Sequence, residues 1–271
     1  PPRSTLFPYT TLFRSDGDDV LQSRSLADEL CEDIEEEGII LLKNENGTLP
    51  LNDVTDVNVF GWGATDAGFV MSGSGSGSAM ERGGVVTPTY FLGGLKQAGF
   101  NYNEELIAAY ESFKSKKDGN QQSLYSQPSE FFRLYEPGSS FYTDELMSRA
   151  KKYSDTAIVV ISRLGGEGPD LPYVQYKYVE GGSPVIDNTR TYLELSTEEE
   201  DMLRAVSKAN FSLVIVVLNT CNVMELGFLN NFGIGAAISV GGPGQSGCKA
   251  IGNVLCGKVN PSGKTTDTYA Y

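Results

Sequence analysis

Apolar runs alternate along the chain with segments in which apolar residues recur every three or four positions. Leu26, Leu30 and Ile34 have helical spacing and predict a first helix over about residues 18–36. Short runs rich in β-branched and apolar residues, typical of buried strands, occur at residues 39–42, 57–61, 158–161, 213–218 and 236–240. Further helices are predicted at residues 87–99, 104–116, 143–153, 196–208 and 245–256.

Local signals mark the ends of two of these helices. Pro88 stands at the expected first position of one helix, with Gly99 just past its end. Ser196 and Glu199 form a capping box in front of another. Strands that alternate with helices indicate a parallel or mixed sheet covered on both faces. We therefore predict an α/β fold, a single doubly wound domain (an α/β sandwich) over residues 16–271 with a mostly parallel sheet.

Three segments show neither helical nor strand periodicity, and we expect them to be loops. They are residues 62–86, 118–142 and 168–195. Residues 1–15 also lack periodicity and differ in composition from the acidic stretch that follows. They have no uninterrupted apolar run and no small-residue cleavage site, so they do not form a secretory signal. They resemble a translated sequencing-adapter read-through, and we expect this leader to be disordered and to carry no function.

Charge and hydropathy narrow the possible partners. The formal net charge of −14 argues against nucleic acid, because phosphate binding needs clustered lysine and arginine. It argues equally against anionic membrane surfaces, and no segment approaches the roughly 20 apolar residues of a membrane span. A neutral substrate agrees best with this charge.

The sequence contains no histidine, which excludes Ser-His-Asp and Cys-His catalysis and histidine-ligated zinc. The cysteines, at 31, 221, 248 and 256, match no metal-binding spacing and are too few for a disulfide scaffold. Cys31 and Cys256 are interpreted as core thiols. No metal and no cofactor are predicted, and a cytoplasmic location is expected.

Glu167 is the candidate catalytic residue. It follows the strand-like run 158–161 within a loop that contains Gly165, Gly166 and Gly168. Loops at the carboxyl ends of strands carry the ligand sites of open α/β sheets, and glycines leave room for a substrate. A carboxyl group held there suits proton donation to a leaving group. The alternative is a tight turn whose glutamate faces water.

Other glycine-rich segments suit other ligands. Residues 61–66 follow a strand as a dinucleotide fingerprint does, but the third glycine is missing and no helix begins there, which disfavours a nucleotide site. The Gly-Ser loop around Ser74 and Ser76 offers hydroxyls and amides to a polar ligand. Residues 241–247 are either a turn that enters a helix or a ligand contact.

An ordered set of motifs resembles the second, α/β-sandwich domain of glycoside hydrolase family 3, the β-glucosidase family. The motifs, in chain order, are Glu37–Asn44, Leu49–Leu51, the Gly-Ser loop, Ser162–Asp170 and Asn260–Lys264. The resemblance covers about residues 20–271.

The resemblance implies that Glu167 is the acid/base of a retaining glycosidase that acts on terminal β-D-glucosyl or related residues. In this family an aspartate nucleophile lies in a Ser-Asp-Trp context on a separate barrel domain. The only tryptophan here, Trp62, follows Gly61, so the nucleophile motif is absent. We therefore expect an oligosaccharide or β-glucoside substrate, a barrel-domain partner, and no glycosidase activity from the isolated chain.

The resemblance also suggests substrate-binding residues: Asp170, Arg163, Ser74, Ser76 and Tyr173. Tyr173, Tyr176, Tyr178 and the aromatics of residues 125–142 are expected to stack on the apolar faces of pyranoses at outer subsites, and the alternative is that half or more of them merely cover the sheet. Asp170 has a turn role as its alternative, and Arg163 is expected to anchor the loop by pairing with a carboxylate.

Two questions stay open at this point. Residues 240–245 and 268–271 resemble the subgroup in which the α/β domain precedes the barrel, so that permuted order is favoured. The alternative function is a non-catalytic carbohydrate-binding or scaffold domain, which would share the fold and the aromatic loops without depending on Glu167.

Overall fold

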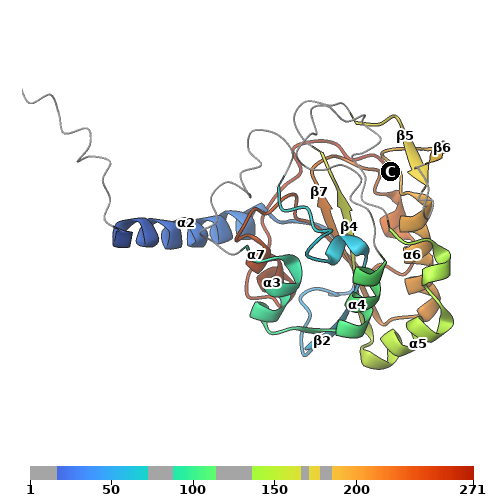
Figure 1. The fold of residues 1–271 in the computed structure, drawn as a ribbon, viewed down its shortest axis with the longest axis horizontal. Coiled ribbons are helices and arrows are strands. Elements are labelled where there is room, and N and C mark those ends of the chain that lie inside the picture. Colours follow the sequence, from blue (N-terminus) through green and yellow to red (C-terminus); the bar gives the residue numbers. More distant parts are fainter. Residues whose placement is uncertain (1–16, 73–87, 114–135, 166–170, 178–184) are drawn as a thin grey trace, which may run out of the picture.

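The computed structural model describes residues 17–72, 88–113, 136–165, 171–177 and 185–271 (Figure 1). Its main sheet has the strand order β1-β8-β7-β4-β2-β3. Strand β1 is antiparallel to β8, whereas the other neighbours are parallel. These strands are β1 (Ile40–Asn44), β2 (Asp56–Phe60), β3 (Asn101–Tyr102), β4 (Thr156–Arg163), β7 (Leu213–Thr220) and β8 (Ala236–Ser239). The predicted mostly parallel sheet is confirmed.

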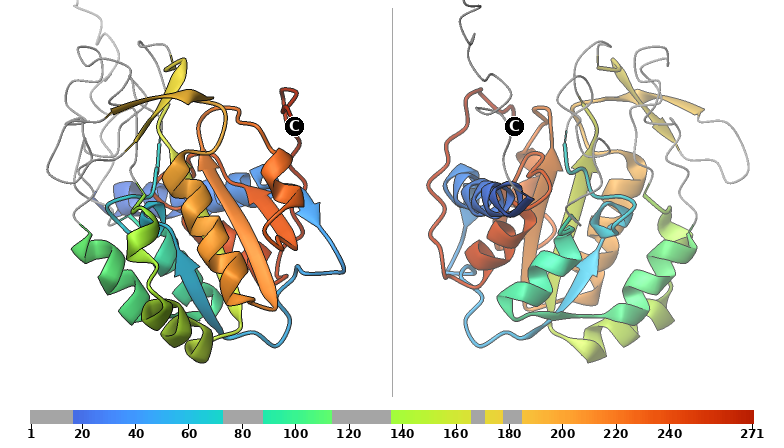
Figure 2. Two further views of the ribbon diagram at one scale, coloured as in Figure 1. Left: turned by 90° about the vertical axis from the view of Figure 1, so that its right-hand side faces the viewer. Right: turned by 60° about the vertical axis from the view of Figure 1, so that its left-hand side comes forward.

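Helices cover both faces of this sheet (Figure 2). The α-helices are α2 (Gly17–Gly38), α3 (Phe91–Ala98), α4 (Glu104–Ser112), α5 (Asp144–Tyr153), α6 (Thr197–Ala209) and α7 (Cys248–Leu255). Short 3-10 helices are η1 (Trp62–Ala64), η5 (Ser139–Phe141) and η6 (Gly227–Asn230). A separate antiparallel hairpin consists of β5 (Val174–Lys177) and β6 (Val185–Thr191).

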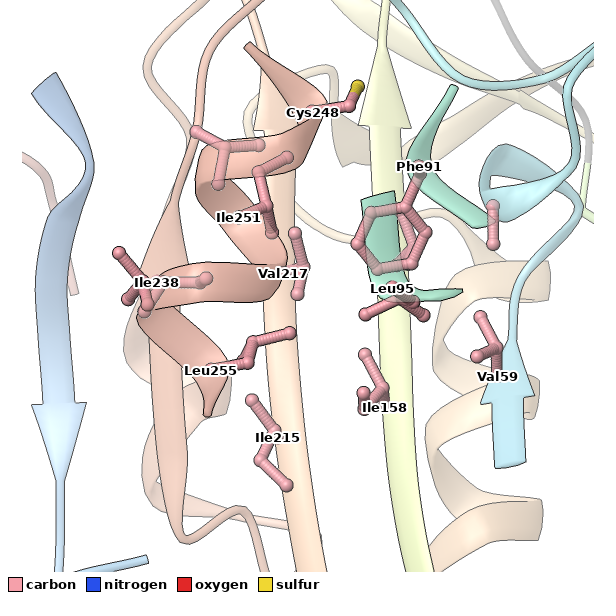
Figure 3. Close-up of a cluster of buried hydrophobic side chains, with 14 of the residues drawn as sticks. Val59, Phe91, Leu95, Ile158, Ile215, Val217, Ile238, Cys248, Ile251 and Leu255 are labelled. Carbon is pink, nitrogen blue, oxygen red and sulfur yellow. The ribbon is translucent and has the colours of Figure 1, made fainter. Parts of the chain in front are cut away.

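Alternate residues of the central strands belong to two hydrophobic clusters, one on each face. Ile158 and Val160 of β4 join the cluster that includes α3 and α7, part of which is drawn in Figure 3. Val159 and Ile161 join the cluster that includes α5 and α6. Because a strand's side chains alternate between faces, an uninterrupted apolar run serves both clusters at once. The predicted doubly wound α/β sandwich is therefore confirmed.

The boundaries of α3 and α6 test the helix-end signals read from the sequence. The capping box of α6 forms as predicted, with Ser196 and Glu199 each bonding the other's backbone N–H. Gly99 ends α3 with φ +105°, also as predicted. The predicted start of α3 at Thr87 and Pro88 is wrong, because Tyr90 is the extended N-cap. The Thr89 amide donates to the carbonyl of Gln245, which keeps the chain out of the helix until Phe91.

The predicted loop 168–195 contains the β5–β6 hairpin, so that prediction is wrong over these strands. The strands are short and mix exposed with buried positions, without the apolar run that revealed β4 and β7. Cys31 was expected in the core but is exposed, because α2 turns its other side toward the domain. Cys256 is half-buried against the α3/α7 cluster.

In the part of the chain that the structure describes, no helix combines the length and apolar character needed to cross a membrane.

Helices α3 and α7 approach each other through glycines. A Cβ on Gly94 would lie 2.1 Å from the carbonyl oxygen of Cys248, and a Cβ on Gly252 would lie 2.6 Å from that of Gly94. Neighbouring Gly93 has more room, because its nearest contact would be Thr89 Cγ2 at 3.5 Å. The contact between the two helices therefore needs glycine at 94 and not at 93.

We predict opposite effects at these adjacent positions. Gly94→Ala should lower the free energy of unfolding by about 1–3 kcal/mol, because a packed backbone must move. Gly93→Ala should leave it unchanged or raise it by roughly 0.5–1 kcal/mol through helix propensity. Urea denaturation of both variants measures the difference. Equal effects at the two positions would contradict this account of the α3–α7 contact.

Candidate functional site

The carboxyl ends of β4 and β7 form the rim from which the Glu167 loop departs. The two strands pair in register to their last residues, with Ser162 opposite Asn219 and Arg163 opposite Thr220. Every residue of β4 is buried. The chain then passes through Leu164 and the buried Gly165. The predicted acid, Glu167, therefore follows the buried end of this strand by four residues.

Arg163 is the last residue of β4, and its guanidinium group is buried in a polar network. Its Nη2 lies 2.6 Å from Glu199 Oε2, and the residue is 5% exposed. Arg163 also donates to the carbonyl oxygens of Tyr192, at 2.5 Å, and Glu194, at 2.7 Å. Burial lowers the pKa of Arg163, but the charge and hydrogen bonds of Glu199 outweigh it and raise this pKa. The predicted pairing of Arg163 with a carboxylate is confirmed.

The Arg163 network also includes the start of α6 and the hairpin. Glu199 Oε2 accepts from the backbone N–H of Ser196 at 2.7 Å within the capping box. Gln175 of β5 donates to the same carbonyls of Tyr192 and Glu194 that Arg163 uses, at 3.1 and 2.8 Å. The network therefore joins β4, β5, the segment around Tyr192 and Glu194, and the start of α6.

Asn219 is the centre of a second network on the same rim. Its Oδ1 lies 2.7 Å from Ser162 Oγ and also accepts from the Val70 N–H at 2.7 Å. Its Nδ2 donates to the carbonyls of Val70 and Gly241. Val70 shortly precedes the Gly-Ser segment, and Ser162 shortly precedes the Glu167 loop. Asn219 therefore bonds both the segment before the Gly-Ser loop and the end of β4, which precedes the Glu167 loop.

Glycines allow the backbone segments of the rim to approach closely. A Cβ on Gly165 would lie 2.2 Å from Asn222 Nδ2, which donates to the Leu164 carbonyl at 3.0 Å. A Cβ on Gly61, whose φ is +107°, would lie 2.4 Å from the Val160 carbonyl oxygen. Any side chain at Gly61 or Gly165 would displace a neighbour on the rim.

Glu136 is a buried carboxylate beside this rim. Its two oxygens accept from the backbone N–H groups of Trp62, at 2.7 Å, and Gly63, at 3.1 Å, in η1. Burial raises the pKa of the Glu136 carboxyl to about 8, although the Trp62 and Gly63 bonds act to lower it. Glu136 therefore holds the segment after β2 while itself favouring the protonated form near neutral pH.

The predicted site residues fall into two groups. Glu167, Asp170, Ser74 and Ser76 lie outside the described residues, so their roles stay predictions. Tyr173 is described and is 90% exposed next to β5, which leaves its ring accessible. The guanidinium of Arg163 bonds Glu199 and two carbonyls, and its predicted role toward substrate stays a prediction.

The loop aromatics that the structure describes include both packed and accessible rings. Tyr142 is buried in the α5/α6 cluster, and its hydroxyl lies 3.3 Å from that of Tyr110. Phe141 packs against Tyr110 and Phe113. Phe141 and Tyr142 thus follow the alternative in which an aromatic residue packs within the fold.

A cavity of about 490 Å³ lies between α5 and α6, away from this network. Its lining includes Met147, Lys151, Lys208 and Ala209, and the last turns of both helices directly precede β4 and β7. Of the predicted site residues, the two that the structure describes, Arg163 and Tyr173, do not line it. Within the described residues, no group of acidic or cysteine side chains is placed to hold a metal ion.

Sequence reasoning missed Glu136 and Asn219. Glu136 lies in an aromatic segment without periodicity, and its partners are more than 70 residues away in the chain. Asn219 offered a weak signal, as the polar residue that ends an uninterrupted apolar run.

Comparisons with known proteins agree with this geometry. A family model described as the glycosyl hydrolase family 3 C-terminal domain matches residues 39–271. A beta-glucosidase of Ruminococcus albus is 32% identical over 90% of the chain, and beta-glucosidase A of Butyrivibrio fibrisolvens is 32% identical over 86%. Among solved structures, beta-glucosidase 3B of Thermotoga neapolitana in complex with glucose superposes with a TM-score of 0.71 at 28% identity.

The matched part is a minor portion of each of these proteins. The chain spans about a quarter of the curated relatives, 23% of the Ruminococcus protein and 27% of the Butyrivibrio protein. The Thermotoga match covers 97% of this chain and 33% of that one.

We predict that Arg163 is a major determinant of stability. Arg163→Met should lower the free energy of unfolding by about 3–5 kcal/mol, because it leaves Glu199 as an unpaired buried charge. Arg149→Met is the control, since its pair with Glu145 is exposed and worth less than about 1 kcal/mol. Urea denaturation at neutral pH compares the two variants. Similar decreases in the free energy of unfolding would show that the buried pair contributes no more than the exposed one.

We also predict that stability falls as pH rises from about 4.5 to about 8. The raised pKa of Glu136 means that the folded state binds more protons than the unfolded state in this window. Glu35, whose pKa burial also raises to about 8, contributes with the same sign. Glu136→Gln should reduce the difference in unfolding free energy between pH 5 and pH 8, and Glu35→Gln should reduce it further. An undiminished difference in the double variant would be inconsistent with this assignment.

Proposed function

The chain belongs to glycoside hydrolase family 3, and on that premise we propose that it is the α/β domain of a retaining β-glucosidase, to which it contributes Glu167 as the acid/base. The observation that carries the proposal is the position of β4. Only Leu164 and Gly165 separate its buried, strongly bonded end from the segment 166–170, which contains Glu167. The substrate class is a terminal, non-reducing β-D-glucoside or a related sugar.

The proposed chemistry needs two carboxyl groups. Retaining glycosidases place them about 5–5.5 Å apart, one as nucleophile and one as acid/base. The nucleophile's carboxylate attacks the anomeric carbon while Glu167 gives its proton to the departing glycosidic oxygen. Water then attacks the anomeric carbon of the glycosyl-enzyme, and the Glu167 carboxylate takes a proton from it. The sugar leaves with retained configuration, and both carboxyl groups return to their starting states.

The nucleophile is proposed to come from a barrel domain. This chain has no Ser-Asp-Trp segment, and it corresponds to about a quarter of its curated relatives. An acid without a nucleophile leaves the first step without its attacking group. The isolated chain is therefore proposed to be inactive, and the order of the two domains stays a prediction.

The rim supports sugar binding beside Glu167. The exposed ring of Tyr173 can stack on the apolar face of a pyranose at an outer subsite. Asp170, Ser74 and Ser76, which lie outside the described residues, are proposed to hydrogen-bond sugar hydroxyls. The common anchoring at Asn219 favours a shared ligand for the Gly-Ser and Glu167 loops.

The acid/base role predicts a dependence on the leaving group. The assay uses this chain mixed with, or fused to, the part of the Ruminococcus albus enzyme outside the matched region. Glu167→Gln should lower kcat/KM roughly 10²–10⁴-fold on an alkyl β-glucoside, whose leaving oxygen needs a proton. It should lower the glycosylation rate far less on 2,4-dinitrophenyl β-glucoside, whose leaving group departs unprotonated.

Glu145→Gln is the matched control, because that carboxylate is 80% exposed on α5. This substitution should leave the rates on both substrates unchanged. Equal losses on the two substrates with Glu167→Gln would refute proton donation. Full activity of that variant would favour the non-catalytic carbohydrate-binding or scaffold function.

A further inference from the structure

Helix α2 contacts the domain through its acidic side. The Asp28 carboxylate accepts from Ser246 Oγ, and Glu32 and Glu36 both accept from Asn253 Nδ2, at 3.2 and 2.8 Å. These polar bonds attach α2 to α7 and to the turn before it. The side chains that face the domain are therefore charged.

The apolar side chains of the same helix face away from the domain. Leu26, Leu30 and Ile34 are 58%, 58% and 62% exposed. Each precedes one of the three acidic contact residues by two positions, which is about 200° around a helix of 3.6 residues per turn. The outer face of α2, defined by these three residues, is thus opposite the face that binds α7.

This orientation is the reverse of an ordinary surface helix, which turns its apolar stripe inward. Figure 1 shows α2 extending away from the rest of the ribbon. The region that the family model matches begins at Ile39, directly after α2. Three large apolar side chains in one row on a projecting helix indicate a surface that another protein part covers.

Charge argues against a second copy of this chain as the occupant. The exposed carboxylates Glu29 and Asp33 border one edge of the outer face, and Glu37 lies at its end. Two such helices would bring like charges together in a chain with net charge −14. A partner with an apolar patch bordered by lysine or arginine would complement both the apolar side chains and the carboxylates beside them.

Size argues for a large partner. A stable interface buries about 800 Å² on each side, which is more than three side chains of one helix provide. The occupant must therefore extend from α2 onto the body of the domain. The relatives have about three quarters of their length outside the region that matches this chain.

We propose that the outer face of α2 is a docking surface for the barrel domain, which contributes an apolar patch bordered by basic side chains. The inference rests on the proposed function, because it takes the barrel as the missing part of the enzyme. It goes further by assigning Leu26, Leu30 and Ile34 to the interface between the domains.

The test mixes the 271-residue chain with the part of the Ruminococcus albus β-glucosidase outside the matched region and measures Kd by calorimetry. Leu30→Glu should weaken binding at least tenfold, and Leu30→Ala, which preserves the helix, should weaken it about 3–10-fold. Tyr153→Glu is the control, since Tyr153 is 40% exposed on α5, and it should bind like the unaltered chain. Raising the salt concentration should weaken binding by the unaltered chain.

Three results would overturn the inference: unaltered binding by Leu30→Glu, no binding by the unaltered chain, or a self-associated chain that Leu30→Glu converts to a monomer in sedimentation. Glu167→Gln separates the two proposals. It should bind with unchanged Kd but lose activity in the mixture, so activity without Glu167 would refute the acid/base role and leave the docking surface intact.

Discussion

The candidate site depends on the buried ion pair between Arg163 of β4 and Glu199 of α6. Removing two charges from water is costly, and such a pair is tolerated only when the remaining donors and acceptors are also bonded. Here the carbonyls of Tyr192 and Glu194 accept from the guanidinium, and the Ser196 amide donates to the carboxylate. The pair can form only when strand, helix and intervening segment are all in place, so it makes them one rigid unit.

This rigidity matters for a reaction divided between two domains. A proton donor functions only when it is held within a fraction of an ångström of its working position. If the nucleophile belongs to a barrel, the 5–5.5 Å between the carboxyl groups spans an interface between domains. Each domain must then fix its own carboxyl group, and the docking surface must fix the domains. We propose that the Arg163 network meets the first requirement and that the outer face of α2 meets the second.

The fold could be predicted further than the site because its signals are local. The apolar runs of β4 and β7, the capping box at Ser196 and the terminal Gly99 each act over a few residues. The start of α3 could not be predicted, since the Thr89 amide is bonded to Gln245, 156 residues later. The hairpin was missed because neither strand has an uninterrupted apolar run.

The residues that hold the rim together act over long separations, and periodicity cannot reveal them. Asn219 bonds Val70 across 149 residues, and Glu136 bonds Trp62 across 74. Helix α2 shows the same limit, because a period of 3.6 residues predicts a helix without predicting which side is covered. The inward face of α2 is acidic and its outward face is apolar. An amphipathic helix usually buries its apolar face, and for α2 this would need a second surface packed against the outward side. The docking surface proposed for α2 gives this apolar face the cover that the described part of the chain does not provide.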